Sequence, residues 1–295
     1  MRCWSITRSL LLLTFALGCH REVEMLPLLE RTIYTTDRFY DIQALSTDRA
    51  VMVGYAGKIL ETTNGGQTWE RLPSGVDSAL YTIRFTDAQH AWITGQDGVI
   101  LHTGETDLSG GQSLATADPI FYDVMFTDLE QGWIVGEFGK IMHTTDGGET
   151  WHEQERSLME GTSTIDVLDL PTLYGVHMMG RQHGAAAGLE GHIARTQDGQ
   201  RWSFDKIEVE YPLVDPLFRV VELPDDSGWA VGAAGEVVRR APGQQVWQRA
   251  HLGQDVLTWL RGVSFSDPQH GWMVGGFGLI YRTTDGGQTW LPSQG

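Results

Sequence analysis

The sequence predicts an all-β protein built from repeated four-stranded antiparallel sheets. Three observations carry this prediction: a glycine pattern that occurs six times, a recurring Asp-Gly-Gly-x-Thr-Trp turn, and apolar stretches short enough to be strands. The chain has 295 residues, of which 41% are hydrophobic, and this excludes wholesale disorder. A single large all-β domain of this length is ordinary.

The glycine pattern is Gly-x-x-Gly-x-(Ile/Val), and the first glycines of successive copies lie 41, 41, 52, 44 and 43 residues apart. The copies occupy residues 54–59, 95–100, 136–141, 188–193, 232–237 and 275–280. Apolar residues alternate on both sides of each glycine pair, which indicates a β-hairpin whose turn takes positive φ values. We therefore expect Gly136 to be required for its positive φ.

Two further strands complete each repeat. One precedes the hairpin, for example at residues 122–126, and the other follows it and begins with a tryptophan such as Trp151. A sheet of about 43 residues cannot bury both faces alone, whereas several sheets packed around an axis can, and this arrangement is a β-propeller. We favour six blades, with seven, one of them degenerate, as the alternative. Residues 26–37 could supply an outer strand to the last blade and so close the ring.

The Asp-Gly-Gly turn recurs in four repeats. Because an active site is needed once and a turn is needed in every blade, we interpret these aspartates as structural turn residues rather than as acids or metal ligands. The glycines take the positive-φ positions of the turn. The residues at the turn position are Asn64, Asp146, Asp198 and Asp285.

The full repeat resembles a known family. Val-Gly-x-x-Gly-x-Ile-x-x-Thr-x-Asp-Gly-Gly-x-Thr-Trp, preceded by Asp-Val-x-Phe-x-Asp and Gly-Trp, is similar to repeats of the photosystem II stability/assembly factor family, and more loosely to the aspartate-box (BNR) repeats of sialidases. The resemblance implies a non-enzymatic propeller that holds a membrane-protein subunit during complex assembly. The photosynthetic members are seven-bladed and bind through a basic surface, whereas this chain has six repeats and a net charge of −17.

The N-terminus has the features of an export signal. Arg2 and Arg8 precede an apolar run, which is followed by the small residue Gly18, and the next residue, Cys19, stands where a bacterial lipoprotein carries its lipid. We expect residues 1–18 to be a signal peptide, 19–36 a lipidated tether, and 37–295 the propeller. The expected location is the periplasmic face of the outer membrane or the cell surface, with a lipid anchor as the sole membrane attachment. Ordinary cleavage that leaves Cys19 as a free thiol is the alternative.

Alignment of the first strands places five aromatic residues and one arginine in one column. First strands line the central channel of a propeller, so this column should form a ring near the axis. Aromatic and arginine side chains dominate protein-binding hot spots, although packing between blades would also place an aromatic in every repeat. The candidate ring residues are Tyr40, Tyr81, Tyr122, Tyr174, Phe218 and Arg261, with Arg84 and Arg219 close by.

The sequence gives no sign of catalysis. The ten histidines are scattered without metal-ligand spacing, no nucleotide-binding glycine loop opens a helix, and the sialidase arginine motif is not matched. We expect no catalytic residue, cofactor or metal, and the negative charge disfavours nucleic acid. The leading hypothesis is a monomeric scaffold or assembly factor that binds a protein partner in the cell envelope. The alternative is a sialidase-like glycoside hydrolase or a carbohydrate-binding propeller.

Overall fold

The computed structural model describes residues 33–34, 36–102, 119–157 and 170–293. By its internal contacts the chain divides into Met1–Tyr34 and Thr35–Gly295, and only the second unit is considered below. The signal peptide, Cys19 and most of residues 26–37 lie outside the described residues, so the expectations placed on them remain expectations.

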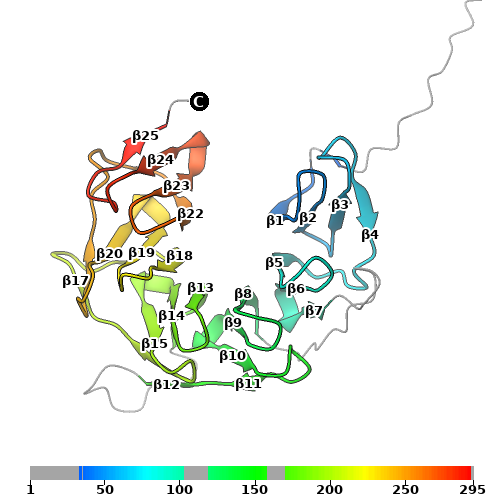
Figure 1. Ribbon diagram of the computed structural model, residues 1–295, viewed down its shortest axis with the longest axis horizontal. Helices are drawn as coiled ribbons and strands as arrows, with labels where there is room; N and C mark the ends of the chain where they lie inside the picture. The colour runs from blue at the N-terminus through cyan, green and yellow to red at the C-terminus, as the bar shows by residue number, and fades with distance from the viewer. Residues whose placement is uncertain (1–32, 35, 103–118, 158–169, 294–295) are drawn as a thin grey trace, which may run out of the picture. The chain divides into compact units, whose positions relative to one another are not determined.

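The described strands form six sheets, one for each glycine repeat, and within each repeat consecutive strands pair antiparallel (Figure 1). Blade one contains β1 (Phe39–Ala44), β2 (Ala50–Gly54), β3 (Ile59–Thr62) and β4 (Glu70–Leu72). Blade two contains β5 (Leu80–Phe85), β6 (Ala91–Gly95) and β7 (Ile100–His102). Blade three contains β8 (Phe121–Phe126), β9 (Gly132–Gly136), β10 (Ile141–Thr144) and β11 (His152–Glu153).

The second half of the chain repeats this order with two additions. Blade four contains β13 (Leu173–Met179), β14 (His183–Gly188), β15 (Ile193–Thr196) and β16 (Arg201–Phe204), and blade five contains β18 (Leu217–Glu222), β19 (Gly228–Gly232), β20 (Val237–Arg240) and β21 (Trp247–Arg249). Blade six contains β22 (Leu260–Phe265), β23 (Gly271–Gly275), β24 (Ile280–Thr283) and β25 (Leu291–Pro292). The additions are β12 (Glu155–Ser157) and β17 (Ile207–Glu208), each parallel to the outer strand of the blade that follows it.

The first strand of each blade lies innermost, and consecutive inner strands are in contact from β1 through β5, β8, β13 and β18 to β22. The predicted six-bladed β-propeller is therefore confirmed. The core lies between neighbouring blades, because each cluster of buried residues combines two adjacent sheets, as Val231 of blade five and Val263 of blade six do. This packing follows from the strand alternation, which gives every sheet two apolar faces.

The glycine pair is explained differently from the sequence-based expectation. Gly136 has φ −164°, which is extended backbone open to any residue, so positive φ does not require a glycine there. The reason is instead a close approach, since a Cβ at this position would lie 2.3 Å from the carbonyl oxygen of Ile120. Positive φ falls on the following residues of the turn, Phe138 at 54° and Gly139 at 61°.

The aspartate turns are tied by short hydrogen bonds. Asp146 accepts bonds from the Thr144 hydroxyl at 2.7 Å and from the Thr150 amide and hydroxyl at 3.0 and 2.6 Å. These hydrogen bonds, chiefly that from the Thr150 hydroxyl, lower the pKa of Asp146 to about 2. The equivalent bonds lower the pKa of Asp285 to about 2 as well. These carboxylates thus accept their hydrogen bonds from residues of the turn itself.

Candidate functional site

The six residues of the predicted ring lie side by side around the axis, one from each blade. The ring centroids of Tyr40 and Tyr81 are 5.2 Å apart, and those of Tyr81 and Tyr122 are 5.5 Å apart. Tyr174 continues the series at 5.0 Å from Tyr122, and Phe218 follows at 5.9 Å. Tyr81 and Tyr122 are stacked and the other three pairs are edge-to-face, and both geometries at these distances are ones that aromatic pairs favour.

Arg261 ends the series. Its guanidinium carbon lies 4.4 Å from the centroid of Phe218, within the range of a cation–π contact. Burial lowers the pKa of Arg261; arginine side chains nevertheless remain protonated in proteins. Among the described residues Arg261 makes no ion pair with a carboxylate.

These side chains line a cavity of about 450 Å³ on the axis. Burial raises the pKa of Tyr122 to about 12, and it also raises the pKa values of Tyr81 and Tyr174. The phenols therefore stay neutral and keep their hydroxyl donors at any physiological pH. Within the described part of the chain no partner takes these donors, so the cavity offers both apolar faces and free hydrogen-bond donors.

A layer of ion pairs underlies the aromatic ring. The Asp123 carboxylate is buried and pairs with Arg219 at 2.7 Å and with Arg84 at 3.3 Å. Arg84 also pairs with Asp41 at 2.5 Å, and the Thr82 hydroxyl lies 2.9 Å from the Asp41 carboxylate and 3.2 Å from that of Asp123, so that either can accept its proton. Although burial opposes it, the nearby Asp123 and Asp41 raise the pKa of Arg84.

This layer changes the part that two predicted residues play. Arg84 and Arg219 do lie at the cavity, as the alignment suggested, but two carboxylates neutralise their two charges. Sequence reasoning missed those partners, Asp41 and Asp123. Their signal was an acidic residue within an apolar inner strand, directly after the ring tyrosine in blades one and three.

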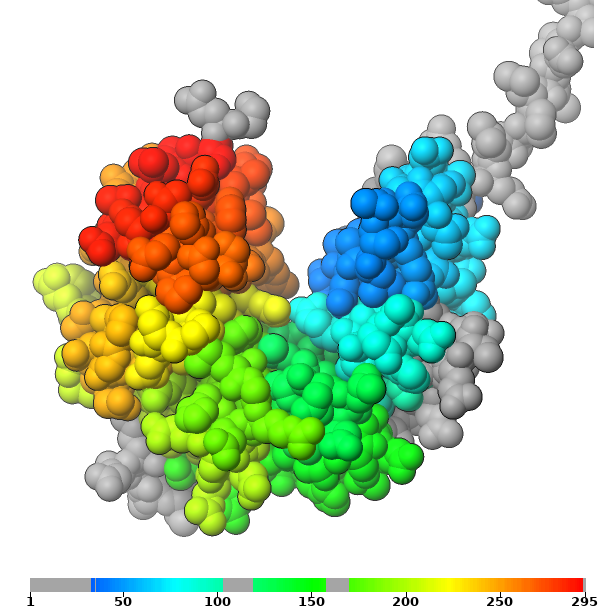
Figure 2. All heavy atoms as spheres, viewed as in Figure 1, coloured from blue at the N-terminus to red at the C-terminus, as the bar shows by residue number. Residues whose placement is uncertain are grey.

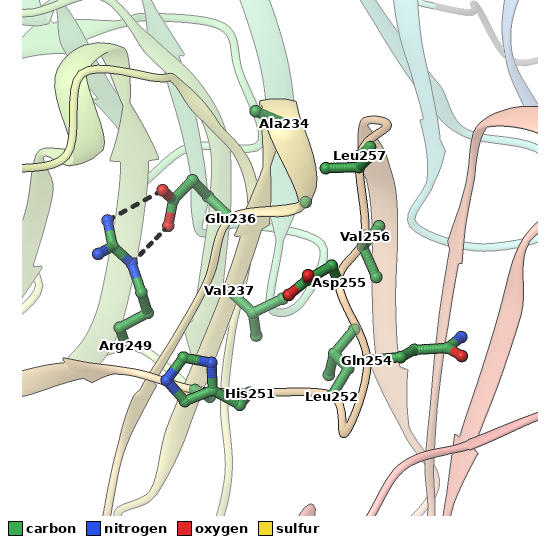
Figure 3. A pocket seen from close by; sticks show the side chains of 12 residues that line it. Ala234, Glu236, Val237, Arg249, His251, Leu252, Gln254, Asp255, Val256 and Leu257 are labelled. Atoms are coloured by element: carbon green, nitrogen blue, oxygen red, sulfur yellow. Dashed lines mark hydrogen bonds and ion pairs between the residues drawn. The ribbon is translucent and has the colours of Figure 1, made fainter.

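A second cavity, of about 320 Å³, lies between the turn of blade five and the loop that leads to blade six (Figure 3). The Glu236 carboxylate there accepts hydrogen bonds from Nε and Nη2 of Arg249 at 3.0 and 2.9 Å. Because these two charged groups neutralise each other, neither is left to bind a ligand. The rest of the cavity wall comes from the turn of blade five and from the single loop that connects blades five and six. The axial cavity, on which side chains from all six blades converge, is the better candidate site.

No cluster of three or more metal-ligating side chains occurs in the described ranges. Nor do those ranges contain a helix of sufficient length and apolarity to cross a membrane.

Comparisons with known proteins agree with this architecture. The family described as photosynthesis system II assembly factor YCF48 matches residues 29–113 and 110–170. Curated protein sequences give no match. A solved structure described as YCF48 bound to D1 peptide is similar at a TM-score of 0.66 and 20% identity, covering 88% of this chain and 82% of that one.

Two more solved structures share the fold. YCF48 from Cyanidioschyzon merolae has a TM-score of 0.66 and 20% identity, over 88% of this chain and 86% of that one. Virginiamycin B lyase from Staphylococcus aureus has a TM-score of 0.68 and 14% identity, over 87% of this chain and 85% of that one. The lyase likeness shows the fold alone, whereas the YCF48 family also matches the sequence repeats. Residues 29–170 accordingly match the YCF48 assembly-factor family, and the propeller as a whole is similar to photosystem II assembly factor-like, aspartate-box repeat propellers.

Proposed function

We propose that this protein is a non-catalytic propeller that binds an acidic peptide segment of a protein partner at the axial cavity. The observation that carries the proposal is the contiguous aromatic series ending on Arg261, the one ring cation without a carboxylate partner among the described residues. The aromatic faces would take apolar side chains of the peptide, and Arg261 would take a carboxylate. The YCF48 structure with D1 peptide supports a peptide as the type of ligand.

Binding is favoured over hydrolysis by the state of the cavity carboxylates. A glycosidase needs one carboxyl group free to donate a proton and a second free to act as base or nucleophile. Asp41 and Asp123 are instead held by Arg84 and Arg219. We expect no hydrolysis of a panel of fluorogenic glycosides. Hydrolysis that is lost on Asp123→Asn substitution would favour the hydrolase alternative.

The binding test uses two forms of one fluorescently labelled peptide, the D1 peptide and a copy with amides in place of its carboxylates. Wild-type protein should bind the acidic form more tightly, and added salt should weaken that preference. Arg261→Gln should remove the preference, and Tyr122→Ala should weaken the binding of both forms. If the wild type and Arg261→Gln show the same preference for the acidic form over the amide form, or if neither shows one, the assignment of Arg261 is contradicted.

We further propose that the protein acts outside the cytoplasm, attached by a lipid on Cys19. The support is the N-terminal pattern of Arg2, Arg8, the apolar run and Gly18. Cells labelled with a radioactive fatty acid should incorporate label into the wild type and not into Cys19→Ser, and the variant should move from the membrane to the soluble fraction. A membrane-bound, unlabelled wild type would contradict this placement.

A further inference from the structure

Blades one and six are the first and last blades, and each has one side face that no other described blade covers. Residues on these two faces are exposed, whereas the equivalent residues of other blades are buried. Trp272 is 39% exposed, whereas its equivalents Trp92, Trp133 and Trp229 are at most 3% exposed. In blade one, Ile42 is 56% exposed, whereas the equivalent Val263 is 7% exposed. The space-filling view shows the two blades apart, with blade one in blue and blade six in orange and red (Figure 2).

The buried tryptophans reveal a pairing rule between consecutive blades. Trp92 of blade two packs on the turn of blade three, where a Cβ on Gly148 would meet its ring at 2.1 Å. Trp229 of blade five packs in the same way on Gly287 of blade six, also at 2.1 Å. Trp133 of blade three donates its indole N–H to the Gly199 carbonyl of blade four at 3.2 Å. A tryptophan in the second strand is thus seated on the glycine turn of the next blade.

The rule also holds where the tryptophan is missing. Blades one and four carry Val51 and Ala185 at this position, and the blades that follow them, two and five, are those whose turn has lost the Thr-x-Asp-Gly sequence. Tryptophan and turn are therefore present together or lost together at all five interfaces between consecutive blades. One tryptophan and one turn are without a counterpart among the described residues: Trp272 of blade six and the Gly65–Gly66 turn of blade one.

The turn of blade one has the conformation of its occupied counterparts. Gly65 and Gly66 have φ values of 68° and 85°, against 69° and 86° for Gly147 and Gly148. The Gly66 amide donates to the Thr62 hydroxyl at 2.9 Å, as the Gly148 amide does to Thr144 at 2.7 Å. Within the described residues a Cβ on Gly66 would meet only the ring of its own Trp69, so the seat is built and empty.

We propose that blade six closes directly on blade one of the same chain, with Trp272 seated on the Gly65–Gly66 turn. Trp272 would then meet Trp69 edge to face, as Trp229 meets Trp290 at 5.4 Å and 76°. The closed ring has six blades and needs no seventh. It also joins Tyr40 to Arg261, the two ends of the aromatic series, and makes the axial site continuous.

Cross-linking tests the closure independently of peptide binding. In the full chain with Cys3→Ser and Cys19→Ser, the pair Ile42→Cys and Val274→Cys is treated with a short bismaleimide. The matched positive control is Val263→Cys with Val231→Cys, the equivalent positions at the packed interface of blades five and six. We expect both pairs to give an intramolecular link in the monomer. Linked dimers would assign the face to a second copy, and an unlinked monomer would assign it to a separate blade or partner; either result overturns the proposal.

A stability comparison provides a second readout. If the ring closes, Trp272→Ala should lower the midpoint of urea unfolding about as much as Trp229→Ala does. The control is Phe277→Ala, which removes a fully exposed aromatic of the same blade and should leave the midpoint unchanged. A Trp272→Ala midpoint equal to that of Phe277→Ala would overturn the closure.

Discussion

At the scale of single residues, a histidine close to Arg219 and Asp123 of the ion-pair layer must stay neutral to keep its hydrogen bond. His177 Nδ1 accepts the backbone N–H of Glu222 at 3.1 Å, which requires that this nitrogen carry no proton. Burial, aided by the nearby Arg219 and opposed by Asp123, lowers the pKa of His177 to about 4. Protonation of this nitrogen would break the hydrogen bond and would place a positive charge in a buried, poorly solvated position.

His177 therefore makes stability depend on pH. A pKa lowered in the folded state means that the unfolded chain binds the proton first, so the stabilisation is complete above about pH 6.5 and is lost as the pH falls through 4. The loss is on the order of 3 kcal/mol. His177→Asn, which keeps an acceptor at the δ position and cannot titrate, should flatten the decline in unfolding free energy between pH 6.5 and 4. An unchanged slope in this variant would contradict the role given to His177.

At the scale of the element, two different turns use glycine for two different physical reasons: Gly136 precedes the turn between β9 and β10, and Gly243 lies in the turn between β20 and β21. Gly136 is extended but crowded by the Ile120 carbonyl, whereas Gly243 has φ 71° with open space around it. A close approach to backbone cannot be relieved by a side-chain movement. A positive φ in open space costs a residue with a Cβ only about 1–2 kcal/mol.

Gly136→Ala should consequently destabilise the protein more than Gly243→Ala, although only Gly243 has a positive φ. We expect the second variant to lose about 1 kcal/mol in unfolding free energy and the first clearly more. Urea unfolding of both variants at one pH provides the measurement. Equal losses would mean that the strand pair β8–β9 can shift to accommodate the methyl group.

At the scale of the whole molecule, aspartate turns in more than one blade make the unfolding free energy depend on acidic pH in the same way. The folded-state pKa values of Asp146 and Asp285 lie at about 2, below the usual value for an aspartate. Their contribution is thus present above about pH 4 and is lost as the pH falls through 2. The double variant Asp146→Asn, Asp285→Asn should show a smaller loss of stability than wild type between pH 4 and 2. A loss as steep as that of the wild type would place the acid sensitivity elsewhere.

The repeat pattern was sufficient to predict the six blades, the recurring turns and the column of aromatic residues, because strand periodicity and turn chemistry are local properties of the chain. The position of one arginine in each of three blades was also visible. Their charges were not, since neutralisation of Arg84 and Arg219 depends on Asp41 and Asp123, which only packing of separate blades brings within reach.

The sequence by itself determined the architecture of each blade, since short, largely apolar segments of 2–7 residues between tight turns leave a strand little choice. The tertiary structure alone decided which ring charge is free, why Gly136 must be glycine, and that Trp272 and the turn at Gly66 lack the partners that their counterparts have. Each of these depends on atoms of different strands, and their distances are set by how strands pair within a sheet or by how one sheet packs on the next.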